Sequence, residues 1–189
     1  MNGKTVYLLL FRGVGGATQL PTAPLRAALT KAGFEQVATY INSGNAVLRT
    51  TLARDRLIEQ VAEIVARQFD FTKAIYAATL AEWSALIECN PFQQAVATPS
   101  LLHVALLADK PKAESVDAIQ ALAQDGEQFQ VIGNVAYLHT PSGFGRSHMA
   151  ARFDKLIGVG NTARNWNTVT KLHALALVAA SAAPAHHFP

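Results

Sequence analysis

Asn42-Ser43-Gly44-Asn45 and Gly133-Asn134 are the two short stretches that decide the fold. Glycine and asparagine side by side favour a tight hairpin turn, and each stretch lies between two apolar runs of the kind that form strands. The flanking runs are residues 36–41 and 46–50 at the first turn, and 128–132 and 135–140 at the second. The echo between the two turns indicates that the chain holds one arrangement twice.

The same order of patterns surrounds each hairpin. The first half has an apolar run at 5–11, helical periodicity at 22–33 and at 57–65, and a strand-like run at 71–77. The second half has a strand at 101–108, a helix from Pro111, a helix at 149–157 and a short strand before the last helix. These patterns predict an α+β protein made of two tandem ferredoxin-like split β-α-β units, each β-α-β-β-α-β, with an additional C-terminal helix.

The patterns also suggest where the parts of the chain begin and end. Thr79 to Glu82 has the spacing of a capping box, so a short helix is expected to begin there and to end at Asn90-Pro91-Phe92. We expect a first unit with this capping helix at 1–92, a linker at 93–100, a second unit with the C-terminal helix at 101–180, and a disordered tail at 181–189.

Composition excludes several classes of protein. Of the 189 residues half are apolar and 15% are charged, and the net charge is only +3, which tolerates an anionic partner but is too small for a dedicated nucleic-acid surface. A single cysteine, Cys89, leaves no disulfide framework and no cysteine-rich metal site. No run of about 20 apolar residues predicts a membrane span. The sequence therefore favours a cytoplasmic protein.

Histidine spacing gives no support for metal chemistry. None of the six histidines forms a paired ligand spacing except His186-His187, which falls in the expected tail. His103 and His139 lie within expected strands, where we interpret them as structural histidines with satisfied hydrogen bonds. No metal site is predicted, and the sequence indicates neither a reaction nor a cofactor.

Polar and cationic residues crowd at the start of the last helix. The candidate ligand-binding residues there are Arg164, Asn165, Asn167, Thr168 and Lys171. Asn165 has the character of a helix N-cap, and two cations beside the positive end of a helix dipole suggest an anion between them. The alternative is structural: Arg164 pairs with a carboxylate of this chain, the asparagines cap the helix, and Trp166 belongs to the core.

Three glycine- and asparagine-containing loops are further candidates. Arg146-Ser147 opens a helix after two glycines and could form an anion nest, although the phosphate-loop lysine and spacing are absent. Arg12-Gly13 precedes Val14-Gly15-Gly16, which is equally incomplete. Asn42, Ser43 and Asn45 complete the set. Ordinary turn chemistry explains each of the three loops as well, unless several of them converge on one cleft.

Five motifs in register resemble the domain of unknown function 1697 family. They are Arg12-Gly13 with Val14-Gly15-Gly16, residues 40–45, Asn90-Pro91-Phe92, residues 143–147 and residues 162–172. The resemblance covers nearly the whole chain and implies a duplicated, ferredoxin-like α+β arrangement without implying an activity. Members usually carry Arg-Gly-Ile-Asn-Val-Gly-Gly in the first loop, so this chain is two residues shorter there, and its loop amides must point differently.

The leading functional hypothesis is binding of an anionic, phosphate-bearing small molecule at the N-terminus of the last helix. One alternative is binding of single-stranded RNA on a sheet face, against which the aliphatic central strands argue. The other is a non-catalytic assembly module in which the polar helix entrance is structural. Arg164→Ala distinguishes them, because a phosphate site predicts lost anion binding with a mild stability change and a structural role predicts the reverse.

Overall fold

The computed structural model describes residues 3–16 and 18–182. This part of the chain forms two compact units, one made of the residues up to Trp83 and from Leu172 onward, the other of Ser84–Lys171. In chain order the elements are β1 (Thr5–Phe11), α1 (Thr22–Lys31), β2 (Glu35–Thr39), β3 (Asn45–Thr50), α2 (Arg54–Phe69), β4 (Ile75–Thr79), α3 (Leu80–Glu88), the 3-10 helix η1 (Gln93–Ala97), β5 (Leu102–Leu107), α4 (Ala113–Gln120), β6 (Gln128–Ile132), β7 (Val135–His139), the 3-10 helix η2 (Phe144–Arg146), α5 (His148–Leu156), β8 (Asn161–Asn165) and α6 (Trp166–Ser181).

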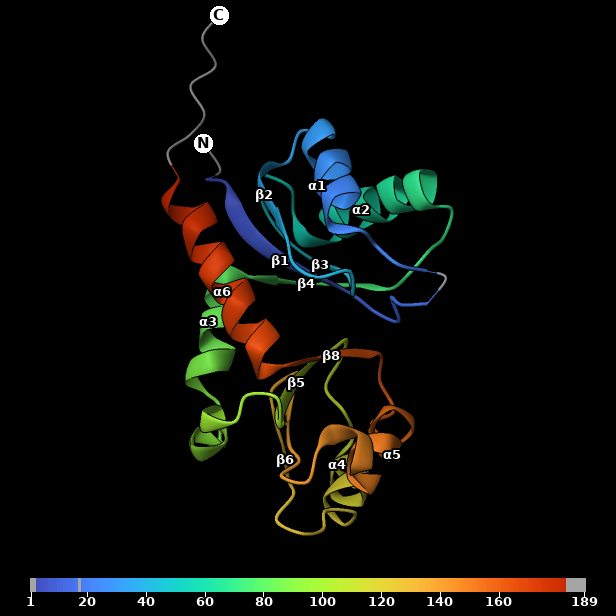
Figure 1. Ribbon diagram of the computed structural model, residues 1–189, viewed down its shortest axis with the longest axis vertical. Helices are drawn as coiled ribbons and strands as arrows, with labels where there is room; N and C mark the ends of the chain where they lie inside the picture. The colour runs from blue at the N-terminus through green and yellow to red at the C-terminus, as the bar shows by residue number, and fades with distance from the viewer. Residues whose placement is uncertain (1–2, 17, 183–189) are drawn as a thin grey trace, which may run out of the picture. The chain divides into compact units, whose positions relative to one another are not determined.

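The first sheet has the strand order β2-β3-β1-β4, and all its pairs are antiparallel. β1 lies between β3 and β4, which is the arrangement of a split β-α-β unit. Helices α1 and α2 lie side by side over one face of this sheet (Figure 1). There Leu29 of α1, Val61 of α2 and Leu9 of β1 belong to one buried apolar cluster.

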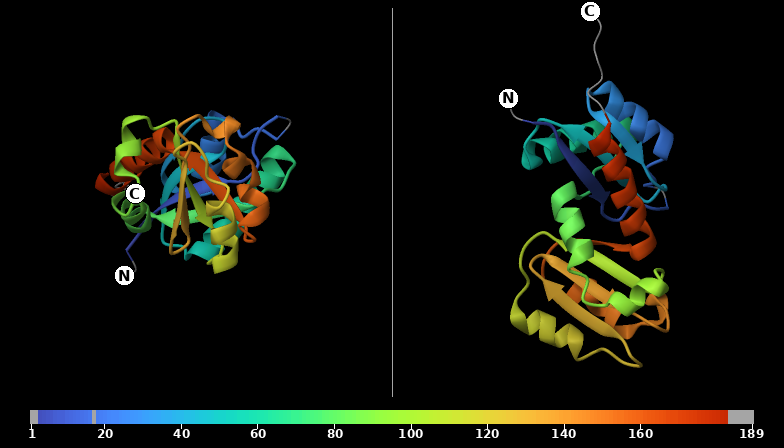
Figure 2. Two further views of the ribbon diagram at one scale, coloured as in Figure 1. Left: turned by 90° about the horizontal axis from the view of Figure 1, so that it is seen from below. Right: turned by 90° about the vertical axis from the view of Figure 1, so that its left-hand side faces the viewer.

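The opposite face of the first sheet is buried as well. Leu8 and Leu10 alternate along β1 with the residues that face α1 and α2, and they are 0% and 1% exposed. The C-terminal half of α6 lies beside β1 (Figures 1 and 2) and buries Leu172, Ala176 and Ala179, whose spacing places them on one helix face. Both faces of this sheet are therefore covered.

The second sheet repeats the first in topology. Its order is β6-β7-β5-β8, again with antiparallel pairs only. Helices α4 and α5 lie side by side (Figures 1 and 2), and Ile119 and Phe153 join Ala105 and Leu138 of the sheet in one buried cluster. The short strand expected before the last helix is β8. The predicted tandem of ferredoxin-like units with a C-terminal helix is thus confirmed.

The two hairpin glycines adopt the expected left-handed backbone, but their surroundings differ. Gly44 has φ 77° and Gly133 has φ 60°. A Cβ atom on Gly44 would lie 2.7 Å from the Cβ of Phe11, whereas one on Gly133 would meet no heavy atom within 4 Å. Gly44 is therefore required by both its backbone conformation and its packing, and Gly133 by its conformation alone.

Some element boundaries differ from the sequence-based expectation. The strand expected at 71–77 begins only at Ile75, because its partner β1 ends at Phe11, which pairs with Ile75. The stretch 93–100, expected to be a linker, contains η1 and lies within the second unit. Of the expected tail, Ser181 is the last residue of α6, and residues 183–189 lie outside the described part of the chain.

Candidate functional site

The first glycine loop closes on itself through Thr18. The Thr18 hydroxyl donates to the carbonyl oxygens of Gly13 (3.4 Å) and Gly15 (3.1 Å), and the Thr18 amide also donates to Gly15 (3.0 Å). Gly13 has φ 64°. The amide of Arg12, whose residue is half-buried, donates to the Ala74 carbonyl at 2.9 Å. These contacts explain Arg12-Gly13 as part of a turn that joins β1 to the residues before β4.

The Asn42, Ser43 and Asn45 side chains fasten the first hairpin. Asn45 is fully buried, and its Nδ2 donates to the Tyr40 carbonyl at 3.1 Å and to the Ser43 hydroxyl at 3.3 Å. The Asn42 Oδ1 accepts from the backbone amide of Thr22, the first residue of α1, at 3.3 Å. Asn42 thereby caps a helix that is distant in sequence, and all three polar residues have structural contacts.

At the start of α6 the predicted cap is confirmed. The Asn165 Oδ1 accepts from the amide of Thr168 at 3.0 Å, and the amide of Trp166 donates to the Pro99 carbonyl at 3.1 Å. Trp166 is 3% and Thr168 5% exposed, whereas Asn167 and Lys171 face solvent. The helix entrance therefore combines a satisfied cap and a core aromatic with two exposed polar side chains.

Arg164 belongs to β8 and not to the helix entrance itself. Its Nη1 donates to the Thr162 hydroxyl at 2.9 Å and to the Ala163 carbonyl at 2.7 Å, and burial lowers its pKa to about 10. In the ladder Arg164 lies opposite Val104, while the next residue, Asn165, lies opposite His103. Because successive strand residues point to opposite faces, the side chains of Arg164 and Asn165 lie on opposite faces of the second sheet.

Ser147 and Arg146 adopt different roles after the second glycine loop. Ser147 is 5% exposed, and its hydroxyl accepts from the Ala150 amide at 2.9 Å, which makes it the N-cap of α5. Arg146 is exposed at the end of η2. The loop begins at Gly143 with φ 102°. Only Arg146 of this pair presents its side chain to solvent.

His103 is the residue that the sequence-based reasoning missed. Its Nδ1 is buried and has no hydrogen-bond partner within residues 3–16 and 18–182. Its ring lies on that of Phe144, with centroids 4.0 Å apart and an interplanar angle of 32°. Burial lowers the pKa of His103 to about 4. The interpretation of His103 as a satisfied structural histidine is therefore wrong, whereas the Nδ1 of His139 lies 3.2 Å from the Gln128 Oε1.

Two sequence signals could have pointed to His103. It is the one ionisable residue in the strand of apolar residues that forms β5, and it shares a face with Ala105 and Leu107 at two-residue spacing, toward the core. Neither signal reveals that Phe144, some 40 positions later, covers it.

His103 lies near two of the predicted candidates in the second unit, the loop at 143–147 and the start of the last helix. Phe144 of η2 packs against its ring, and α5 begins directly after that 3-10 helix with its cap, Ser147. On the other side Asn165, the ladder partner of His103, caps α6. Directly opposed residues of an antiparallel pair point to the same face, so both helix N-termini lie near this imidazole. We call His103, Phe144, Arg146 and Asn165 the histidine site.

The histidine site contains groups with positive charge or potential. The N-termini of α5 and α6 each carry a partial positive charge, and the exposed cation Arg146 directly precedes Ser147, the N-cap of α5. Among the described residues no group of three or more His, Cys, Asp or Glu side chains could hold a metal ion. The predicted ligand-binding residues Arg12, Gly13, Asn42, Ser43 and Asn45 belong to the first unit and are not part of this site.

The sheet faces that RNA binding would use are buried. Leu8 and Leu10 of β1 are 0% and 1% exposed, and Leu102 and Val104 of β5 are 0% and 3% exposed. Single-stranded RNA needs exposed aromatic side chains on which to stack, and these positions are neither exposed nor aromatic.

None of the helices in the described chain has the length and hydropathy that a membrane crossing requires.

Comparison with known proteins identifies a family and a shared fold. A solved structure, that of the conserved bacterial protein SP0830 from Streptococcus pneumoniae, aligns with a TM-score of 0.69 over 92% of this chain and 99% of that chain, at 22% sequence identity. No curated protein matches the chain. The family described as "Protein of unknown function (DUF1697)" matches residues 4–137. The chain, with its tandem ferredoxin-like units, therefore belongs to the DUF1697 family.

Proposed function

We propose that the protein binds a small, phosphate-bearing anion at the histidine site of the second unit. The observation that carries the proposal is the buried Nδ1 of His103, which has no hydrogen-bond partner in the described chain. A buried polar atom without a partner costs free energy, and a ligand that supplies the partner recovers that cost. With its single exposed cysteine and few charges, the protein is best suited to the reducing cytoplasm.

The anionic character of the ligand follows from what surrounds His103. The N-termini of α5 and α6 and the guanidinium of Arg146 all favour negative charge nearby. His103 itself is neutral near pH 7, because burial lowers its pKa to about 4. The imidazole therefore serves as a neutral hydrogen-bonding group, and the positive potential comes from the helices and Arg146.

A phosphate ester suits a neutral imidazole better than a carboxylate does. Its second pKa is about 6, so near neutral pH the dianion, with oxygen acceptors only, exchanges with a populated monoanion that also carries a hydroxyl donor. Either tautomer of His103 then finds a partner on the same ligand. A carboxylate with a pKa near 4 offers acceptors only.

Access to Nδ1 requires Phe144 to move away from the imidazole. Phe144 lies between Gly143, whose φ is 102°, and Gly145, whose surroundings leave space for a side chain. A displacement of this 3-10 helix exposes His103 without breaking the Ser147 cap of α5. Phe144 then stands beside the ligand and shields it from water.

The test is thermal unfolding of the wild type, His103→Phe and His139→Phe with inorganic phosphate, ribose 5-phosphate, AMP and a short RNA, at two salt concentrations. Phenylalanine fills the His103 position without a polar atom, so this variant is expected to remain folded. A ligand that binds the native state raises the unfolding midpoint according to RT ln(1 + [L]/Kd).

The proposal predicts that at least one phosphate compound raises the midpoint of the wild type and of His139→Phe but not that of His103→Phe. An equal rise in His103→Phe contradicts it, as does the lack of a rise with every phosphate compound. A rise with RNA alone that disappears at high salt supports the nucleic-acid alternative instead.

A further inference from the structure

We propose that a groove in the first unit binds a medium-chain aliphatic carboxylate, independently of the histidine site. The groove has a volume of about 670 Å³ and lies where β1 begins, β3 ends, β4 passes into α3, and α6 makes its last turns. This volume falls in the range of small-molecule sites. Every residue that lines it belongs to the first unit.

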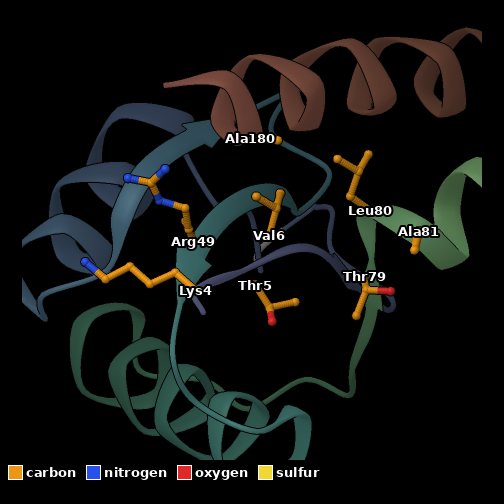
Figure 3. A pocket seen from close by; sticks show the side chains of 8 residues that line it. All are labelled: Lys4, Thr5, Val6, Arg49, Thr79, Leu80, Ala81 and Ala180. Atoms are coloured by element: carbon orange, nitrogen blue, oxygen red, sulfur yellow. The ribbon is translucent and has the colours of Figure 1, made fainter. Parts of the chain in front are cut away.

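One end of the groove is apolar. Val6, Leu80, Ala81 and Ala180 form its walls, and Figure 3 shows them around the space beside β1. Among residues 3–16 and 18–182, none of those that line the groove is aromatic, so they offer a nucleobase no ring on which to stack. The hydroxyl of Thr79 is already used in the capping box with Glu82, at 3.1 and 3.2 Å. An aliphatic chain therefore suits this end better than an aromatic or heavily hydroxylated ligand.

The other end of the groove is cationic. Lys4 and Arg49 lie together on the side of β1 that faces β3, whereas Leu80 follows β4 on the other side (Figure 3). Both cations contact one carboxylate, Glu35: the Lys4 Nζ at 2.5 Å and the Arg49 Nη2 at 3.2 Å. Two positive charges and one negative charge leave a net charge of +1 at this end.

Lys4 is the residue that can reach a ligand anion. Its side chain is 42% exposed, whereas that of Arg49 is 9% exposed and donates through Nη1 to the Ala182 carbonyl at 2.8 Å. An ammonium group has three donors, and one of those of Lys4 is used by Glu35. The hydrogen bond from Lys4 holds the pKa of Glu35 below its usual value, so the carboxylate stays charged at neutral pH. The remaining Lys4 donors and the surplus charge suit a single carboxylate.

The test is isothermal titration of the full chain with octanoate, 1-octanol and acetate at pH 7.5. Ala180→Trp fills the groove from an exposed helix position, and Ala174→Trp adds the same side chain at an exposed position of α6 that does not line it. Lys4→Gln removes the accessible cation, and Lys31→Gln removes an exposed lysine of α1.

Saturable binding is expected for octanoate in the wild type, Ala174→Trp and Lys31→Gln, and it should be lost in Ala180→Trp. Lys4→Gln should raise the dissociation constant for octanoate about two- to fivefold, the range for an exposed ion pair. Any binding of octanol should be unchanged in this variant. Acetate lacks the chain and should not bind. Equal octanoate binding in Ala180→Trp, or octanol that binds the wild type as tightly as octanoate, would overturn the proposal. Neither result bears on the histidine site.

Discussion

The two units share one strand order, but a buried polar side chain of the first unit and one of the second differ in their hydrogen bonding. In the first unit Asn45 is fully buried, and its amide donates to Tyr40 and Ser43. In the second unit the buried Nδ1 of His103 has no partner within the described residues. The same topology thus accommodates a polar group that completes the fold and one that the fold leaves unsatisfied. The second kind is the better pointer to a ligand.

The largest expected effect separates the two hairpins. Gly44→Ala should lower the free energy of unfolding by about 3 kcal/mol, because left-handed backbone and overpacking against Phe11 both oppose the new methyl group. Gly133→Ala should lower the free energy of unfolding by only about 1 kcal/mol, because no atom lies close to the new methyl group. Urea unfolding of both variants measures the difference. Equal losses would mean that Phe11 yields to the methyl group and that the two hairpins are equivalent.

A pH series separates the two units by their titrating groups. Burial lowers the pKa of His103 from 6.5 to about 4, so as the pH falls below 6.5 the unfolded chain binds a proton before the folded chain does. The contribution of this group to the free energy of unfolding is fully present above pH 6.5 and decreases toward pH 4, by about 2.5 kcal/mol at pH 4.5.

The free energy of unfolding of His103→Phe should fall less between pH 7.5 and pH 4.5 than that of the wild type, because the variant lacks the imidazole. Urea unfolding of both proteins at pH 7.5, 6.0 and 4.5 measures the difference. In the first unit, Lys4 lowers the pKa of Glu35, so the contribution of Glu35 to the free energy of unfolding is lost only below about pH 4.5. Parallel pH profiles for wild type and His103→Phe would show that the imidazole is solvated in the native state.

A smaller effect distinguishes the two faces of the second sheet. Arg164→Ala should cost about 1 to 2 kcal/mol, because the guanidinium bonds to Thr162 and Ala163 are lost. Binding at the histidine site should be unchanged, since Arg164 lies on the face of β8 opposite to Asn165. Thermal unfolding with and without a phosphate ligand measures both quantities. A mild stability change together with lost phosphate binding would instead show that Arg164 contributes to the ligand site.

The fold was largely accessible from the sequence, because strand alternation, helix periodicity and the two Gly-Asn turns are local signals. The cap at Asn165 and the capping box at Thr79 and Glu82 are local too, and both are present. The start of β4 was not accessible, because it depends on where β1 ends.

The candidate site was accessible only in part. The polar loops were recognised, but a sequence does not show that Asn42 caps a helix 20 positions away. The face to which Arg164 points depends on the register of β8 against β5. His103 was misjudged because hydrogen-bond satisfaction is a property of the folded surroundings, here a strand face and the ring of Phe144.

The most direct test of the histidine site is the pKa of His103 itself, measured by NMR titration of the imidazole with His103→Phe as the assignment control. We expect a pKa near 4 in the free protein, followed by an upward shift when inorganic phosphate, ribose 5-phosphate or AMP binds, because an adjacent anion stabilises the protonated ring. A pKa near 6.5 in the free protein, or one that none of the three compounds moves, would contradict phosphate binding at the histidine site.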